Sequence, residues 1–380
     1  MKQELASFLT TIDSELYSLT KYLYDNPEES FHEYKACKYI TDLLKSYNFN
    51  TLTNYLDVNT AFFSQFGEGH PKICLICEYD ADINYGHIYG FNAKTTISIG
   101  AALTLSKTIS KIGGSVVLIG CPGELKSSLK STMFKQGTFE DMDAILSAQP
   151  HVITAQSGTS MASLPLKLNF SSNNKMTGIA SSHWNFNTAL IIFNALNYLI
   201  STSKASLDIN NLSFSNLVDS DPKISEMAFT LNSVSYQNIS DHELKIREFF
   251  KGLCSLLNID FELHLSDAPC TELLSSSTLS RLFSHNLKEC GIINIDKPKN
   301  LSSYLSLGII SHSIPCIHPY ISITENSSVR YGTNFFADET ITPYAHNIIM
   351  KTIKALAFTS IDLIENNSLL FEAKNELNNK

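Results

Sequence analysis

The sequence predicts an α/β fold in which a mixed sheet carries helices on both faces and is interrupted by a smaller inserted domain. Three observations lead to this prediction. Apolar runs of strand length alternate with helical patterns up to about residue 160, as in sheets covered by helices. The order changes to β-α-β-β-α-β near residue 162, and the first pattern resumes near 272. At 380 residues, the chain is also long enough for two domains.

The first part of the chain predicts helices and strands in turn. Apolar side chains three and four positions apart predict a helix over 4–24, which Pro27 ends because proline cannot continue a helix. Gly113 and Gly114 predict the end of a long helix. The further helices expected here are 34–47, 95–113 and 130–139, and the strands are 60–67, 72–80, 114–122 and 143–150.

The inserted part predicts a ferredoxin-like unit, the split β-α-β arrangement. Its expected strands are 161–170, 211–218, 226–236 and 259–266, and its helices are 185–203 and 241–258. We therefore expect a discontinuous α/β domain over 1–162 and 272–380, and a lid or dimerisation domain over 163–271.

Composition and charge exclude several classes of partner. The net charge of −9 comes with no Lys/Arg block, which argues against nucleic acid or an anionic membrane. The eight cysteines are scattered, and the Cys74–Cys77 pair lies in a predicted strand that points the two side chains to opposite faces. The N-terminal segment has no signal-peptide pattern, and the longest apolar run is too short to cross a bilayer. We expect a cytoplasmic protein with reduced thiols.

Four segments carry motifs in a consistent order and spacing. They read NPEESFHEYKACKYITDLL, EYDADINYGHIYGFN, GCPGELKSSLKSTMFKQGTFEDMDAILSAQP and GIISHSIPCIHPYISI. Together they resemble the metallo-carboxypeptidase/aminoacylase amidohydrolases, in the branch with auxin-conjugate hydrolases, aminobenzoyl-glutamate hydrolase and β-alanyl dipeptidases. The resemblance covers nearly the whole chain and implies a zinc-peptidase-like domain with a lid.

The resemblance implies two-metal amide hydrolysis. In that family two divalent ions, usually zinc, share a water and are held by a Cys, a Glu and three His, while a further Glu is the general base. Glu124 matches the general base, and Asp80 matches an Asp that braces a metal-site histidine. The five ligand positions correspond here to Tyr89, Phe91, Leu125, Gln149 and Gly332.

None of these five positions retains a zinc ligand of the required type, since Gln149 offers only a neutral amide oxygen. We therefore predict that the two-metal centre is lost and that no cofactor is bound. Removing two dications also removes the reason to bury a thiolate and carboxylates, which are costly without them. Tyr89, Phe91 and Leu125 are expected to fill the vacated space with apolar surface.

Several retained residues allow more than one interpretation. Glu124 is solvated, paired with Lys126 or Lys130, or has a raised pKa. Asp80 is a remnant of the metal site or a cap for the loop after its strand. Three further residues are candidates for a ligand-binding cleft, with structural hydrogen bonds as the alternative interpretation: His87, Asn92 and His151.

The main functional prediction is a non-catalytic protein that binds a small peptide, an acyl-amino acid or a protein partner. The resemblance implies a homodimer through the lid and allows pairing with an active paralogue; Gly178 stands where relatives have a lid His. The alternative is a divergent amidohydrolase or dipeptidase with relocated metal ligands, which would be Asp80, His87, Glu124 and His151. A Cys121 hydrolase is a third class, without an identifiable His and carboxylate partner.

Overall fold

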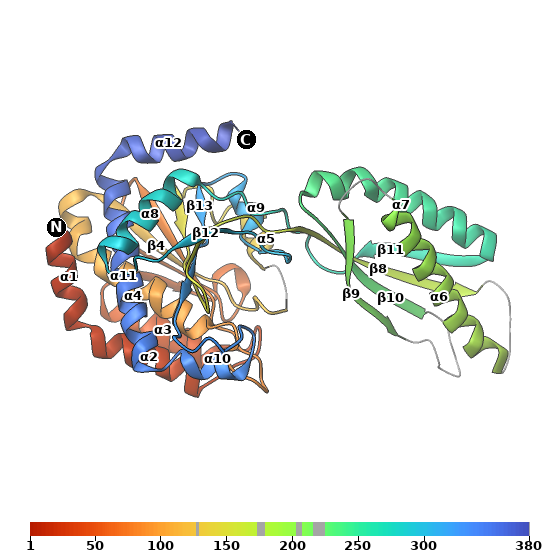
Figure 1. The fold of residues 1–380 in the computed structure, drawn as a ribbon, viewed down its shortest axis with the longest axis horizontal. Helices are drawn as coiled ribbons and strands as arrows, with labels where there is room; N and C mark the ends of the chain where they lie inside the picture. Colours follow the sequence, from red (N-terminus) through yellow and green to blue (C-terminus); the bar gives the residue numbers. More distant parts are fainter. Residues whose placement is uncertain (127–128, 173–178, 203–206, 216–224, 380) are drawn as a thin grey trace. The chain divides into compact units, whose positions relative to one another are not determined.

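The computed structural model describes residues 1–126, 129–172, 179–202, 207–215 and 225–379. The chain forms two compact units (Figure 1). Unit 1 contains Met1–Thr159, Leu274–Asn300 and Ile310–Lys380, and unit 2 contains Ser160–Leu273 and Leu301–Ile309. The predicted larger domain included 301–309, which lie in unit 2 because Tyr304 pairs with Met161 at the start of that unit. The lid position Gly178 lies outside the described residues.

The principal sheet of unit 1 has six strands in the order β1-β2-β4-β3-β5-β13. The neighbouring strands β4, β3, β5 and β13 are parallel, whereas β2 is antiparallel to β4 and β1 is antiparallel to β2, so the sheet is mixed. The strands are β1 Asn50–Thr53, β2 Phe62–Glu68, β3 Lys72–Cys77, β4 Gly114–Gly120, β5 Ala144–Leu146 and β13 Cys316–Ile317.

A second sheet in unit 1 has the order β12-β7-β14-β6. Its strands are β6 Gln149–His151, β7 Ala155–Ser157, β12 Asp296–Lys299 and β14 Tyr320–Ser322. The predicted strand 143–150 is therefore two strands, because β5 and β6 enter different sheets. This division places Gln149 and His151 on the second sheet, beside β14.

Three helices of unit 1, α1, α2 and α11, pack against one long central helix, α4, Phe91–Ile112. Eighteen of its 22 residues are buried, between β3 and β4 and the helices α2 and α11. The other helices are α1 Lys2–Thr11, α2 Asp13–Asp25, α3 Tyr34–Ser46, the short 3-10 helix Tyr55–Asp57, α5 Leu129–Lys135, α8 Ser277–Glu289, α10 Asn334–Glu339, α11 Pro343–Glu365 and α12 Asn367–Asn378. The short helix α9, Gly308–Ser311, contains residues of both units. The helix predicted over 4–24 is two helices, broken at the buried Ile12.

Unit 2 has the predicted β-α-β-β-α-β order. Its elements are β8 Ala162–Ser172, α6 Ile179–Ser201, β9 Leu207–Ser215, β10 Ser225–Ser233, α7 Tyr236–Leu257 and β11 Ile259–Leu265. The sheet is antiparallel with the order β11-β8-β10-β9, so β8 and β10 are central and β9 is an edge. The helices bury one face of this sheet in a core of its own.

The fold-class prediction is confirmed. No helix in the described ranges has the length and apolar character to cross a bilayer.

The unit 2 core gives a direct test of packing. Phe250 on α7 is fully buried and contacts Phe229 and Phe249, with ring centroids 6.4 and 5.7 Å away. Phe250→Ala should lower the free energy of unfolding by about 3–5 kcal/mol, because it leaves a cavity in the core. Urea denaturation followed by circular dichroism measures the change.

Leu256 provides the matched control, since it lies on the same helix with 86% of its surface exposed. Leu256→Ala should change stability by about 0.5 kcal/mol or less. Equal effects of the two substitutions would contradict the assigned orientation of α7.

Candidate functional site

The site is built around the loop that joins β3 to α4. The left-handed backbone of Gly90, with φ of 69°, starts α4 directly after this loop. The Gly332 N–H donates to the Ile88 carbonyl over 3.1 Å, which attaches the segment before α10 to the same loop. Two distant parts of the sequence thus meet beside Tyr89.

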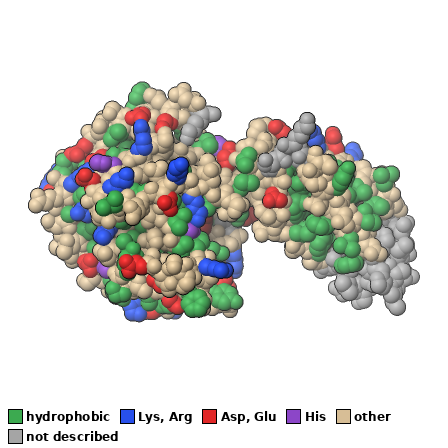
Figure 2. Space-filling view, in the orientation of Figure 1, with side chains coloured by type: hydrophobic (Ala, Val, Ile, Leu, Met, Phe, Trp, Pro, Cys, Tyr) green, Lys and Arg blue, Asp and Glu red, His purple; other side chains and the backbone are tan. Residues whose placement is uncertain are grey.

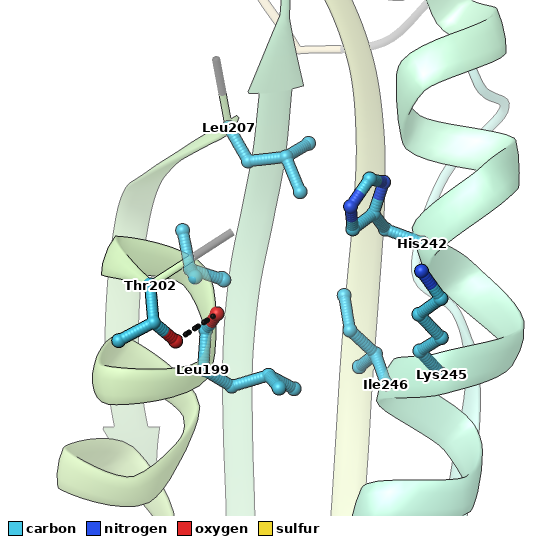
Figure 3. A pocket seen from close by; sticks show the side chains of 7 residues that line it. Leu199, Thr202, Leu207, His242, Lys245 and Ile246 are labelled. Atoms are coloured by element: carbon cyan, nitrogen blue, oxygen red, sulfur yellow. Dashed lines mark hydrogen bonds between the residues drawn. The ribbon is translucent and has the colours of Figure 1, made fainter. Parts of the chain in front are cut away.

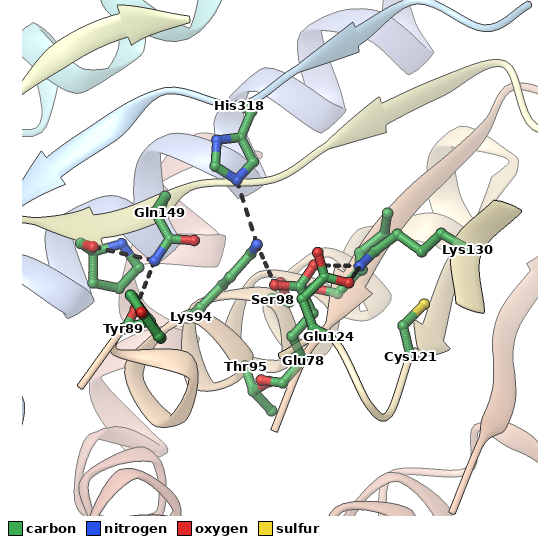
Figure 4. Close-up of polar contacts among 12 residues, drawn as sticks. Glu78, Tyr89, Lys94, Thr95, Ser98, Cys121, Glu124, Lys130, Gln149 and His318 are labelled. Atoms are coloured by element: carbon green, nitrogen blue, oxygen red, sulfur yellow. Dashed lines mark hydrogen bonds and ion pairs between the residues drawn. The ribbon is translucent and has the colours of Figure 1, made fainter. Parts of the chain in front are cut away.

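Four of the five predicted ligand positions converge here. The Gln149 amide donates to the Tyr89 carbonyl over 2.7 Å (Figure 4). The same amide nitrogen lies 3.3 Å from the Tyr331 hydroxyl. A Cβ on Gly332 would lie 3.5 Å from the Tyr89 ring. The Phe91 ring centroid is 6.1 Å from that of Tyr89. Neutral side chains therefore contact one another where the resemblance implies metal ligands.

Leu125, the fifth position, does not join this packing. Its side chain is 36% exposed, so the expectation that it fills the hollow is wrong. Its N–H donates to Asp80 Oδ2 over 2.9 Å, which holds the loop after β4 against the end of β3. The exposed leucine extends from this anchored turn.

A chain of buried charges adjoins the neutral cluster (Figure 4). The Glu78 carboxylate forms ion pairs with two lysines. Lys130 Nζ lies 2.6 Å from Glu78 Oε1, and Lys94 Nζ lies 2.6 Å from Glu78 Oε2. Lys130 also pairs with Glu124, and Lys94 Nζ lies 3.4 Å from His318 Nε2. Glu124 is thus paired with Lys130, one of the two lysines considered from the sequence.

Electrostatics keep this chain ionised. Burial alone would raise the pKa of Glu78, but the charges of Lys130 and Lys94 outweigh it and lower this pKa to about 2. Burial would lower the pKa of Lys130, whereas Glu124 and Glu78 raise it above its usual value. For His318, burial and then Lys94 lower the pKa to about 3, so the imidazole is neutral.

Asp80 is a loop anchor with a perturbed acidity. Its Oδ2 accepts bonds from the Ser30 hydroxyl at 2.7 Å and the Leu125 N–H, while its buried Oδ1 has no hydrogen-bond partner. Burial raises its pKa to about 6 despite these two bonds. This geometry fits the cap interpretation of Asp80.

The three residues assigned to a possible cleft are enclosed instead. His87 is 2% exposed and its Nε2 lies 3.0 Å from the Leu23 carbonyl, while Asn92 is fully buried and donates to the Thr340 hydroxyl over 2.8 Å. His151 stacks on the Tyr331 ring at 4.4 Å between centroids. The cleft assignment is therefore wrong for His87 and Asn92, because both are packed against helices and loops of the core.

Two divalent ions do not fit these residues. The converging positions supply rings, a carboxamide and a glycine, and the adjoining carboxylates already hold ammonium groups. Within the described part of the chain, no group of three or more His, Cys, Asp or Glu is placed to hold a metal. Asp80, His87, Glu124 and His151 each have different partners and do not form a relocated site.

The prediction missed Glu78, Lys94 and His318. One signal for Lys94 was available, since it is the only charged residue in the first four turns of α4. Lysine is rarely buried without a partner, so such a position predicts a buried anion nearby. Nothing local in the sequence indicates that the anion is Glu78.

Two other candidates have less chemistry. Cys121 is 1% exposed and burial raises its pKa to about 12, so its thiolate is strongly disfavoured.

Unit 2 contains a hollow of about 350 Å³ between α6 and α7 (Figure 3). It is lined by Leu199, Ile200, Thr202, Leu207, His242, Lys245 and Ile246. The His242 ring bonds the Asn238 carbonyl of its own helix at 2.8 Å.

Comparisons with known proteins identify the relatives. No family model matches the chain. One of the chains of p-aminobenzoyl-glutamate hydrolase from Escherichia coli K12 is 31% identical over 156 residues, which span 36% of this chain and 32% of that protein. Xaa-Arg dipeptidase from Mus musculus is 22% identical across 99% of this chain and 92% of its own length.

Solved structures agree on the fold. A dinuclear metal-binding peptidase of the M20 family from Bacillus subtilis superposes with a TM-score of 0.67 at 15% identity, covering 93% of this chain and 99% of its own. An aminobenzoyl-glutamate utilization protein from Klebsiella pneumoniae gives 0.69 at 11% identity, covering 93% and 98%. The chain has the fold of the M20 peptidase and is similar in sequence to aminobenzoyl-glutamate hydrolase and Xaa-Arg dipeptidase. The resemblance predicted from its motifs is confirmed.

Asp80 and His87 predict opposite effects of pH on stability. The folded pKa of His87 is about 4, lowered by burial from 6.5, so this residue decreases stability as pH falls from 6.5 to 4. The folded pKa of Asp80 is about 6, raised from 3.8, so it increases stability over nearly the same interval. Each contributes a slope of up to about 1.4 kcal/mol per pH unit. Urea unfolding at fixed pH steps measures the net slope.

His87→Asn should make the loss of stability on acidification shallower, and Asp80→Asn should make it steeper. Each variant serves as the control for the other, because both substitute a buried polar group near the same loop. Slopes parallel to that of the unmodified protein in both variants would contradict the two pKa shifts.

Proposed function

We propose that this relative of the M20 peptidases has lost the two-metal centre and acts as a non-catalytic binding protein for a small peptide, an N-acyl amino acid or a protein partner. One observation carries the proposal. Gln149 bonds the Tyr89 backbone and approaches Tyr331, so the predicted ligand positions satisfy each other as neutral groups. A metal-bound water and a polarised carbonyl need cations at that place.

The position of the general base supports the same proposal. Glu124 forms an ion pair with Lys130, which is 1% exposed. A carboxylate held by an adjacent ammonium is a weak proton acceptor, because the positive charge stabilises its ionised form. Glu124 itself is only half-buried, so it lies at the accessible end of the charge chain.

A homodimer through unit 2 is part of the proposal. The helix α6 exposes Phe186, Leu190, Ile191 and Tyr198, and β9 is an edge strand of the sheet formed by the described residues. Figure 2 shows hydrophobic side chains on the surface of unit 2. Exposed apolar side chains beside an open edge are typical of an interface between protomers. An active paralogue would fit the same face. We further propose a cytoplasmic location, supported by eight cysteines that are all buried and free.

A charged substitution on the exposed face of α6 tests the proposed dimer. Ile191→Glu, on a residue that is 46% exposed, should shift the protein to monomer in light scattering, because an unpaired carboxylate would be buried. Leu256→Glu on α7 is the control and should leave the oligomeric state unchanged. A protein that is monomeric before substitution would contradict the dimer.

Metal content and ligand binding test the main proposal. We expect less than about one tenth of an equivalent of zinc in protein purified without chelator, because the site lacks ligands of the required type. We also expect no hydrolysis of aminobenzoyl-glutamate or Xaa-Arg dipeptides, the compounds named for the relatives. The melting temperature of the protein should rise when a peptide or acyl-amino acid that it binds is added. Mass spectrometry, product assay and thermal shift measure the three quantities.

Leu125→Asp should reduce that thermal shift, because Leu125 is exposed beside Glu124 and a second carboxylate there would repel a ligand carboxylate. Leu52→Asp, on another exposed leucine of unit 1, is the matched control. Stoichiometric zinc together with turnover would favour the divergent amidohydrolase instead. No thermal shift with any peptide or acyl-amino acid would contradict the proposed binding of these small molecules.

A further inference from the structure

The buried charges of unit 1 alternate in sign along one continuous chain. The order is Glu124, Lys130, Glu78, Lys94, and the neutral His318 closes the far end (Figure 4). Each oxygen of Glu78 receives a different ammonium at 2.6 Å, so this carboxylate bridges two cations. The arrangement balances two positive with two negative charges.

Burial makes these cations costly to keep. Lys94 and Lys130 are 3% and 1% exposed, and an ammonium removed from water loses several kcal/mol of hydration. Only a close anion compensates for that loss, and the bridging Glu78 supplies one to both. Packing alone does not explain either lysine, because apolar side chains would fill the same space without the hydration cost.

The sequence positions of the two lysines connect them to the altered site. Lys94 comes shortly after the ligand position Phe91 in the sequence, in the first turn of α4. Lys130 comes shortly after the ligand position Leu125 and lies on α5. The Lys94 ammonium also lies 5.8 Å from the centre of the Phe91 ring. The ammonium groups thus enter the site from the same two segments that lack metal ligands.

We propose that Lys94 and Lys130 are built-in cations that replace a dinuclear metal centre electrostatically, with Glu78 as the bridging carboxylate. The inference rests on the proposed function, because two dications and two ammonium groups cannot share the site. It adds that the two ammonium groups balance the negative charges of Glu78 and Glu124, so that the fold does not depend on metal ions.

The test compares melting temperatures of charge-changed variants of the full chain. Lys94→Met leaves the buried chain with one uncompensated carboxylate and should lower the melting temperature by on the order of 10 °C. The double variant E78Q/K94M is balanced again, since Lys130 and Glu124 still pair, and should be more stable than Lys94→Met alone. Lys38→Met removes one partner of the exposed Lys38–Asp42 pair and is the control, with almost no change expected.

Chelation and added metal give a second measurement. EDTA should leave the melting temperature of the unmodified protein unchanged, and added zinc should raise that of Lys94→Met more than that of E78Q/K94M, because only the former has an excess negative charge. If Lys94→Met does not fold, folding of E78Q/K94M still supports the proposal. Failure of both to fold, or a Lys94→Met variant as stable as Lys38→Met, overturns it.

These outcomes separate the inference from the proposed function. If the charge variants behave as expected but no peptide or acyl-amino acid binds, only the binding role fails. If the unmodified protein contains stoichiometric zinc and EDTA lowers its melting temperature, both fail.

Discussion

A carboxylate buried at the carboxyl end of a central strand must be balanced by positive charge, and Glu78 imposes this constraint on unit 1. It follows β3, in the middle of the principal sheet, and is 3% exposed. Lys94 from α4 and Lys130 from α5 meet it from two sides. Three elements are therefore fixed relative to one another by one side chain. Because hydrogen bonds to ionised groups are directional as well as strong, this contact specifies the position of α4, on which much of the core packs.

The neutral cluster and the charged chain divide the site into two kinds of environment. Tyr89, Gln149 and Gly332 contact one another with uncharged groups, so that part needs no counter-ion. The adjoining part holds four charges and leads outward to Glu124, which is half-buried. Glu124 and the exposed Leu125 are therefore the parts of the charged chain and its loop that a ligand can reach from solvent.

Much of the fold could be predicted from the sequence because hydrophobic periodicity reports local structure. The antiparallel β-α-β-β-α-β unit was predicted with its order, since each strand and helix there is a separate periodic run. The break at Ile12 was missed because the apolar pattern continues across it. The second sheet was missed for a different reason: β6 pairs with β14, which lies about 170 residues later, and periodicity carries no information about such pairings.

The site could be predicted in position but not in charge balance. Motif spacing located the ligand positions, yet Leu125 is exposed, and neither Lys94 nor Glu78 was predicted as part of the site. The resemblance implies that relatives hold two dications with a thiolate and a carboxylate as their anionic ligands, which leaves two positive charges. Here Tyr89 and Leu125 remove those two anions, and two ammonium groups again leave two positive charges beside Glu78 and Glu124. Under the proposed function, conserving the net charge explains why loss of the anionic ligands and the presence of buried lysines belong together: either change alone would leave uncompensated charge in a largely buried site.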